Sequence, residues 1–356
     1  MENTELKKLI TELSGLMSIS GFTSVDGDRL KSLLGDIFDE CESTPAGNYR
    51  FVKRCGRENA RKILIDTHFD EIGMMVTGIR DGGFLNVINI GGLDTAILQA
   101  GEVTVYGKDE NGVRHDIYGV VASTPPHLRK PGDAMKLRDI SEILIDTGYP
   151  VNELGKFVSV GTPVGFRPVY SELKNGFIAG KAFDDKACAA CAAAAIAETA
   201  REDLIGDVIL QLSNFEEAGG GMTGALTGAF AEEPDCALVA DVNLGRTPDT
   251  KKSETVVVGG GTAVTLSPIT DRRLSSALIA EARDAGIKVQ VCVAAGSTGT
   301  NTNVINLAGK GIPTVDVGLP LKSMHTSTEV ISMNDAESLK NVIKLFISSG
   351  KIAAEI

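Results

Sequence analysis

The chain has 356 residues, of which 43% are hydrophobic, 40 are glycine and 12 are proline, a composition typical of a globular protein with about two domains. Its formal net charge of −12 argues against a nucleic acid or an anionic membrane as a partner. No apolar run approaches the roughly 18 residues of a membrane span, and the polar amino terminus is unlike a secretion signal, so we expect a cytoplasmic protein.

The amino-terminal part of the chain has an α/β pattern. Leu6, Leu9, Ile10 and Leu13 recur at helical spacing, which predicts an amphipathic helix that covers the core. After a break at 20–24 we expect a second helix over about 28–34, and then strands at 49–53 and 62–67.

Between residues 74 and 164 the pattern changes to short β-rich runs at 74–79, 84–88 and 102–106, with glycine-bearing turns between them. These runs predict a small barrel of antiparallel strands. The segment is predicted to be inserted, so that residues 1–73 and 165–356 form one discontinuous α/β domain and residues 74–164 form the barrel.

Helices and strands alternate again after the insertion. We expect helices near 187–201, 272–285 and 335–348, and strands at 208–212, 237–240, 289–293 and 312–317. Such alternation is typical of a largely parallel sheet covered by helices, so the predicted fold class is α/β with an inserted small β-barrel.

Six cysteines in a chain of this length do not indicate a disulfide framework. Cys188 and Cys191 form a C-x-x-C pair, but they lie in an alanine-rich helix. We therefore interpret them as small residues packed against a sheet rather than as a redox or zinc motif.

Candidate functional residues lie near the ends of the predicted strands, where open α/β sheets bind their ligands. The first two are His68 and Asp70, and His68 is placed to bind a metal while Asp70 orients it. Similar positions are held by Asp184, Asp185, Glu216, Glu217, Asp241 and His325.

Each of these residues has an ordinary explanation when it is taken alone, such as a helix cap or a solvated turn. Together they offer imidazole nitrogen and carboxylate oxygen from several strands, which is the ligand set that divalent metals prefer. Two metals about 3.5–4 Å apart also need a carboxylate that can bridge them.

Four segments resemble the di-metal aminopeptidases of peptidase family M42, a family that includes tetrahedral dodecameric peptidases, glutamyl and deblocking aminopeptidases, and proteins called endoglucanase M. The segments are DTHFDEIG at 66–73, KAFDDK at 181–186, FEEAG at 215–219 and MHTSTEV at 324–330. The resemblance covers nearly the whole chain, including the inserted segment.

The resemblance implies a zinc-peptidase-like fold and two divalent metal ions per subunit, with zinc favoured and cobalt or manganese as alternatives. It implies that His68 and Asp241 hold one metal, that Glu217 and His325 hold the other, and that Asp184 bridges them. It also implies Glu216 as the general base, Asp70 as the support of His68, and a cis peptide bond after Asp184.

Further expectations from the resemblance concern partners. The substrates are expected to be short peptides, from which amino-terminal residues are removed. The inserted barrel is expected to form dimers, of which six close into a hollow particle, and to take no part in the chemistry.

Three segments depart from the family pattern, at positions where family members shape the substrate pocket. Lys186 replaces an arginine, the loop 296–303 reads GSTGTNTN where Gly-Thr-Asp-Ala is usual, and Lys322-Ser323 replaces Arg-Tyr. The preferred amino-terminal residue therefore stays open.

Two alternatives belong to other functional classes. A glycoside hydrolase needs two free carboxylic groups set about 5–9.5 Å apart across a sugar, and this chain has no tryptophan to stack on one. A non-catalytic metal-binding assembly protein of the same fold would bind metal and hydrolyse no peptide.

Overall fold

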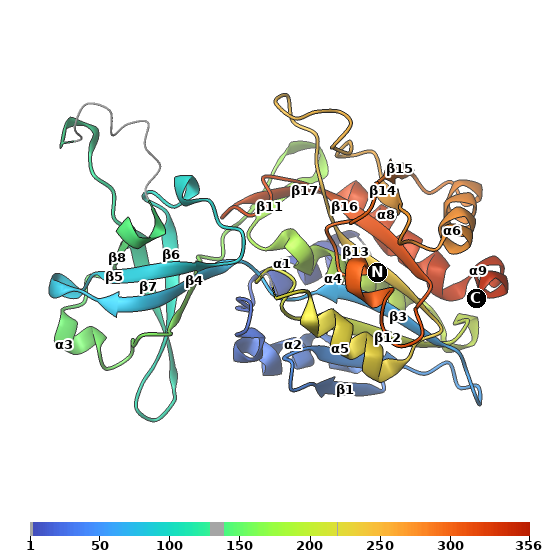
Figure 1. Ribbon diagram of the computed structural model, residues 1–356, viewed down its shortest axis with the longest axis horizontal. Helices are drawn as coiled ribbons and strands as arrows, with labels where there is room; N and C mark the ends of the chain where they lie inside the picture. The colour runs from blue at the N-terminus through green and yellow to red at the C-terminus, as the bar shows by residue number, and fades with distance from the viewer. Residues whose placement is uncertain (1–2, 129–138, 219) are drawn as a thin grey trace.

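The computed structural model describes residues 3–128, 139–218 and 220–356, and it shows a barrel beside a larger, helix-covered sheet (Figure 1). The barrel strands are consecutive in the chain, so the polypeptide leaves the larger part once and returns once. Among the helices of the described residues, none is long and apolar enough to cross a membrane.

The predicted barrel is confirmed: it is closed and antiparallel, and neighbouring strands are hydrogen-bonded in the order β4-β5-β8-β7-β6-β9. Alternate residues face its core, so that Met74 and Val76 are buried while Thr77 is exposed. The strands are β4 (Gly73–Ile79), β5 (Leu85–Ile90), β6 (Glu102–Lys108), β7 (Arg114–Val121), β8 (Leu144–Asp146) and β9 (Pro163–Phe166), and a short helix, α3 (Val151–Leu154), precedes β9.

The larger part is built on an eleven-stranded sheet with the order β1-β2-β12-β3-β13-β16-β17-β11-β10, in which β16 also pairs with β14, and β14 with β15. Its strands are β1 (Glu40–Ser43), β2 (Tyr49–Lys53), β3 (Lys62–His68), β10 (Tyr170–Glu172), β11 (Phe177–Gly180), β12 (Asp207–Ser213), β13 (Cys236–Leu244), β14 (Thr262–Leu266), β15 (Val289–Val293), β16 (Thr314–Lys322) and β17 (Glu329–Ser332).

The parallel arrangement predicted for the sheet is found at its centre, where β12, β3, β13 and β16 run side by side in one direction. Most outer strands pair antiparallel, and short connections such as those between β1 and β2 and between β10 and β11 can only make hairpins, but β14 and β15 pair parallel. The sheet is therefore mixed, and its parallel centre brings several carboxyl strand ends to one edge.

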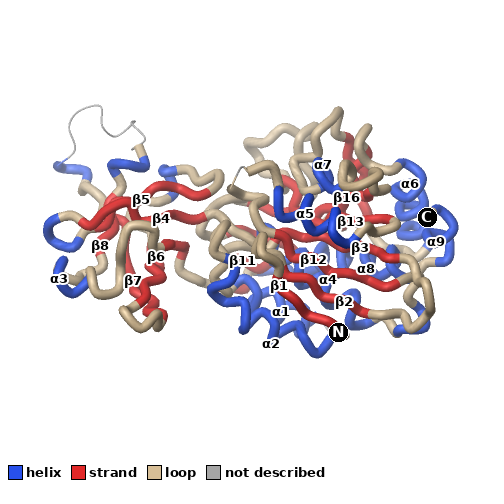
Figure 2. Tube along the Cα trace, turned by 60° about the horizontal axis from the view of Figure 1, so that its bottom comes forward, coloured by secondary structure: helices blue, strands red, loops and turns tan. Residues whose placement is uncertain are grey.

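Helices cover both faces of the sheet (Figure 2). Ile63 and Ile65 of β3 face one helical layer, and Leu64 faces the other. The first layer comprises α1 (Asn3–Ser14), α2 (Gly27–Leu34), α4 (Phe183–Glu198), α6 (Arg272–Asp284), α8 (Met333–Ser348) and α9 (Gly350–Glu355), and the second α5 (Thr223–Glu232) and α7 (Thr302–Ile305).

Helix α4 lies in the middle of the first layer, where it packs on the sheet and contacts helices α1 and α8. All its residues from 183 to 196 are buried, which the run of alanines allows because small side chains let neighbouring elements approach closely. Cys188 and Cys191 contact backbone carbonyl oxygens, and burial raises the pKa of both thiols. They are packing residues, as their sequence context predicted.

Candidate functional site

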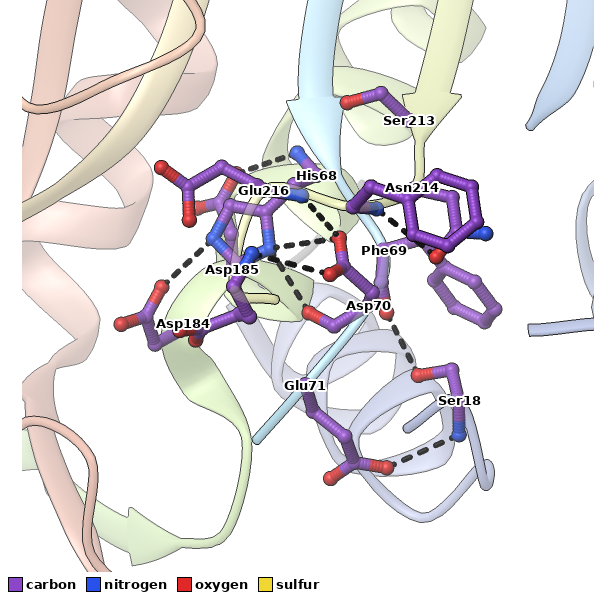
Figure 3. A network of polar contacts seen from close by, with 12 residues as sticks. Ser18, His68, Phe69, Asp70, Glu71, Asp184, Asp185, Ser213, Asn214 and Glu216 are labelled. Atoms are coloured by element: carbon purple, nitrogen blue, oxygen red, sulfur yellow. Dashed lines mark hydrogen bonds and ion pairs between the residues drawn. The ribbon is translucent and has the colours of Figure 1, made fainter. Parts of the chain in front are cut away.

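The site lies at the carboxyl edge of the parallel strands, in a cavity of about 480 Å³. Elements of the sheet place several wall residues: His68 ends β3, the segment after β12 carries Glu216, and Asp241 lies in the last half of β13, whereas Asp184 lies at the start of α4. Six of the residues singled out from the sequence line the cavity, namely His68, Asp184, Glu216, Glu217, Asp241 and His325. The other two, Asp70 and Asp185, are fully buried and do not line the cavity (Figure 3).

Asp184 lies between the two histidines. Its Oδ1 is 2.9 Å from Nε2 of His68, and its Oδ2 is 3.3 Å from Nε2 of His325. On the outer sides, Asp241 lies 3.9 Å from His68 and Glu217 lies 3.2 Å from His325. The site therefore has two halves that share one carboxylate, and the peptide bond that follows Asp184 is cis.

Acidic groups outnumber basic groups in the cavity, which is lined by four carboxylates and two imidazoles. Burial and the neighbouring acids raise the pKa of Asp241 well above its usual value, and burial also raises that of Glu217. Conversely, Asp184 and Glu217 raise the pKa of His325 to about 11. The raised pKa of His325 favours a protonated imidazole, whose positive charge offsets part of the negative charge of the carboxylates.

A divalent cation fits this donor set. His68, Asp184 and Glu217 offer ligand atoms that lie within 4.8 Å of one another, and His68, Asp185 and Asp241 do the same. A cation would supply the positive charge that the cluster lacks, and imidazole nitrogen with carboxylate oxygen suits zinc and its neighbours in the periodic table.

Asp70 contacts both His68 and the segment that carries Glu216 (Figure 3). Its backbone oxygen is 2.8 Å from Nδ1 of His68, while its carboxylate is 3.7 Å from that nitrogen. The carboxylate instead accepts hydrogen bonds from the backbone N–H groups of Glu216 and Glu217, at 3.3 and 3.2 Å. It thus fixes the turn that carries both glutamates.

Glu329 performs a similar task on the other side of the site and was not assigned a role from the sequence. It is buried, and its two oxygens accept hydrogen bonds from the backbone N–H groups of Asp184 and His325, at 3.0 and 3.1 Å. Its place in the segment 324–330 was the available signal, but only the fold shows that one carboxylate reaches both residues.

The barrel, which was expected to take no part in the chemistry, also reaches the site. Gly92 lines the cavity, and its backbone oxygen accepts a hydrogen bond from Nδ1 of His325 at 3.1 Å. Nothing in the sequence pattern indicated this contact, because the two residues are 233 positions apart.

The three departures from the family pattern differ in their relation to the cavity. Thr298, Gly299 and Thr300 of the loop 296–303 are wall residues, as predicted. Lys186 is not, because it is fully buried and donates to Glu71 and to the backbone oxygen of Leu16. The expectation that Lys186 shapes the substrate pocket is therefore wrong, and Lys322-Ser323 also lies outside the cavity wall, which Met324 and His325 form instead.

Comparison with known proteins agrees with this geometry. The family model of M42 glutamyl aminopeptidases matches residues 47–342. The lysyl aminopeptidase of Pyrococcus furiosus is 30% identical over 351 residues, which are 97% of this chain and 96% of that protein.

Solved structures show the same architecture over the whole chain. An aminopeptidase from the archaeon Desulfurococcus kamchatkensis superposes with a TM-score of 0.87 at 28% identity, over 98% of this chain and 96% of that one. The TET1 peptidase of Pyrococcus horikoshii, which can assemble into a tetrahedron or a large octahedral shell, gives a TM-score of 0.82 at 25% identity, over 97% and 99%.

Proposed function

This chain belongs to the M42 family of aminopeptidases, and from that premise we propose that it removes amino-terminal residues from short peptides with two divalent metal ions. The observation that carries the two-metal proposal is the position of Asp184, whose two oxygens face the two histidines separately. A carboxylate in that position can hold two cations at once.

We assign His68 and Asp241 to one metal, Glu217 and His325 to the other, and Asp184 to both. Asp185 lies close enough to His68 and Asp241 to belong to the same half, but its Oδ2 already accepts the backbone N–H of His68. Zinc is the favoured ion, and cobalt or manganese would also suit the ligands. When bound, the two ions would lower the pKa of a water molecule and polarise the carbonyl group of the scissile bond.

We propose Glu216 as the general base. It lines the cavity and is the one cavity carboxylate without a histidine partner among the ion pairs within 4 Å, so its oxygens are free to meet a water molecule. Burial and the nearby acids raise its pKa to about 7, close to the pH at which a general base works best. Glu216 would take a proton from the attacking water and pass it to the nitrogen of the leaving peptide.

The geometry of the site does not favour a glycoside hydrolase. Such an enzyme needs two carboxylic groups that are free to act across a sugar. Here Asp184, Glu217 and Asp241 all face histidines, and only Glu216 is left.

We also propose that the chain works as a cytoplasmic dodecamer built from barrel-mediated dimers. The assembly proposal rests on relatives such as the TET1 peptidase. All six cysteines are free thiols, which is typical of proteins in a reducing compartment.

The test is hydrolysis of a panel of aminoacyl chromogenic amides after chelation, with and without added zinc, cobalt or manganese. Activity that appears only with metal, and only on substrates with a free amino group, is expected. Full activity in the presence of the chelator would contradict the metal requirement. Two bound metals without hydrolysis of any substrate would instead favour a non-catalytic protein.

A further inference from the structure

The two histidines of the site are held in different ways. His68 ends strand β3, its side chain is 1% exposed, and its Nδ1 meets the backbone oxygen of Asp70, which belongs to the same part of the molecule. His325 lies on a loop, its side chain is 34% exposed, and its Nδ1 meets the backbone oxygen of Gly92, which belongs to the barrel.

In both cases the contact decides which ring nitrogen is available. A backbone oxygen can only accept, so Nδ1 must carry a proton. When a cation takes the place of the proton on Nε2, that nitrogen can offer its lone pair to the cation among the carboxylates. For His68, the contact comes from the larger part of the molecule, which is built on the eleven-stranded sheet and is called the catalytic part below. For His325 the contact is supplied by the inserted barrel.

The barrel segment is shaped for this close approach. A Cβ atom on Gly92 would lie 3.0 Å from Nδ1 of His325. A Cβ atom on the neighbouring Gly91, which has a φ of 79°, would lie 3.1 Å from the backbone oxygen of Glu217 and 2.8 Å from Ile72. The two glycines therefore pack directly against the two residues of one half of the site.

Two hydrogen bonds within the barrel hold the segment in place. Both end on the backbone oxygen of Gly91: one comes from the backbone N–H of Leu93 at 3.0 Å, and one from the side-chain amide of Asn89 at 2.9 Å. Barrel groups thus help to set the position of the Gly92 carbonyl.

We propose that Gly92 is a positioning residue for the Glu217–His325 metal position, so that metal affinity there depends on how the barrel is seated. The His68–Asp241 position does not share this dependence, because its histidine is held without the barrel. This inference rests on the proposed metal ligands and adds that only one of the two positions is under control of the inserted domain.

The test is metal binding to the apoprotein, measured by zinc titration against a competing chromogenic chelator. Gly92→Ala keeps the carbonyl group, and Gly92 does not have the left-handed φ that alanine avoids. Its added methyl group would displace the His325 ring. We expect one equivalent bound as in the unmodified protein and the second bound 10- to 100-fold more weakly, the range found when a contact of a metal ligand is lost.

The matched control is Gly78→Ala in strand β4. It makes the same change in the same barrel, where a Cβ atom meets nothing within 4 Å, and should bind both equivalents normally. If Gly92→Ala does not fold, as judged by circular dichroism, the exposed Asn89→Ala decides, because it loosens the segment without adding a clash. It should weaken the second equivalent in the same direction by a smaller factor.

A double variant identifies which position responds. His325→Ala should bind one equivalent, and adding Gly92→Ala to it should leave that equivalent unchanged. Two equivalents of unchanged affinity in Gly92→Ala, or a weakened first equivalent in the double variant, would overturn the inference. If the unmodified protein itself binds no metal, the proposed function fails first, so the two failures are distinguishable.

Discussion

At the scale of single residues, the acids of the site divide by what their oxygens face. Asp184, Glu217 and Asp241 face histidines in the cavity, whereas Asp70 and Glu329 accept backbone N–H groups of the residues that carry the cavity side chains. Through these hydrogen bonds, Asp70 and Glu329 hold the backbone of the residues whose side chains line the cavity. Removing one of these buried acceptors would leave backbone donors unsatisfied, which costs about 1–3 kcal/mol each.

Replacing Glu216 tests the role proposed for it. Glu216→Gln keeps the shape of the side chain but removes its basic oxygen, so turnover should fall by about a hundredfold or more. Metal content, measured by mass spectrometry, should stay at the value of the unmodified protein, and the exposed Glu202→Gln should behave normally in both assays. Near-normal turnover in Glu216→Gln would remove Glu216 from the mechanism.

Asp66 predicts a pH dependence of stability. Its carboxylate accepts hydrogen bonds from Gln211 and Asn301, and burial raises its pKa to about 6 from the usual 3.8. The folded protein therefore keeps a proton that the unfolded chain releases between about pH 4 and pH 6. The stability that this group contributes is present below about pH 4 and is lost as the pH rises through 6.

Asp66→Asn should remove that dependence. Relative to the unmodified protein, its free energy of unfolding should gain up to about 3 kcal/mol between pH 4 and pH 7.5, since one pKa unit corresponds to about 1.4 kcal/mol. Urea unfolding at the two pH values measures the difference, and the exposed Asp203→Asn serves as the control. Parallel pH profiles for Asp66→Asn and the unmodified protein would contradict the prediction.

At the scale of elements, hydrogen bonds to the sheet hold the glycine- and threonine-rich loop 296–303 where it lines the cavity. Thr300 and Thr302 donate their hydroxyl groups to the same buried oxygen of Asp316 in β16, at 2.6 and 2.9 Å. Thr298 in turn contacts the hydroxyl group of Thr300 at 2.9 Å. The sheet thereby fixes the part of the loop that lines the cavity.

Asp316→Asn should loosen this wall without touching the proposed metal ligands. A charged acceptor of two hydroxyl groups would be lost, and hydrogen bonds to charged groups contribute about 1.5–3 kcal/mol. We expect KM for peptide substrates to rise roughly tenfold while metal content stays unchanged. Asp335→Asn is the matched control, because Asp335 is equally buried but binds the backbone at Gly259 and Gly261, away from the cavity wall.

An unchanged KM in Asp316→Asn would show that the loop keeps its place without this anchor. A fall in metal content would show instead that the loop and the metal positions are linked, which the hydrogen bonds of Asp316 with Thr300 and Thr302 do not suggest.

At the scale of the whole molecule, the inserted barrel joins the catalytic part at the site and not only at a distance from it. Ile72, which follows strand β3, and Gly91, which follows strand β5 of the barrel, lie against each other there. A change in barrel orientation would therefore reach His325 directly.

The proposed dodecamer predicts a native mass of about 450 kDa, twelve times the 37.4 kDa of the chain. Sedimentation velocity or mass photometry of the purified protein measures it. Relatives of this fold can form closed shells, and a closed shell is the result of symmetric contacts repeated on every subunit. A stable species of one chain's mass at micromolar concentration would contradict the proposal.

Much of the catalytic part could be predicted because its signals are local. Apolar periodicity placed β3, β12 and α8 within a few residues, and the rule that ligands gather at carboxyl strand ends singled out His68 and His325. Helix α5 and strands β1, β10, β11, β14 and β17 were not predicted. The strands among them have only three to five residues, which is too few to show a clear periodicity.

The sequence by itself determined which residue types stand at the strand ends, and therefore the metal chemistry that this protein can support. Only the tertiary structure decided what holds those residues: Gly92 beside His325, Glu329 between Asp184 and His325, Asp316 beneath Thr300, and Lys186 buried away from the cavity. The reason is physical. A strand end is specified by neighbouring residues, whereas these contacts depend on how segments far apart in the chain pack together.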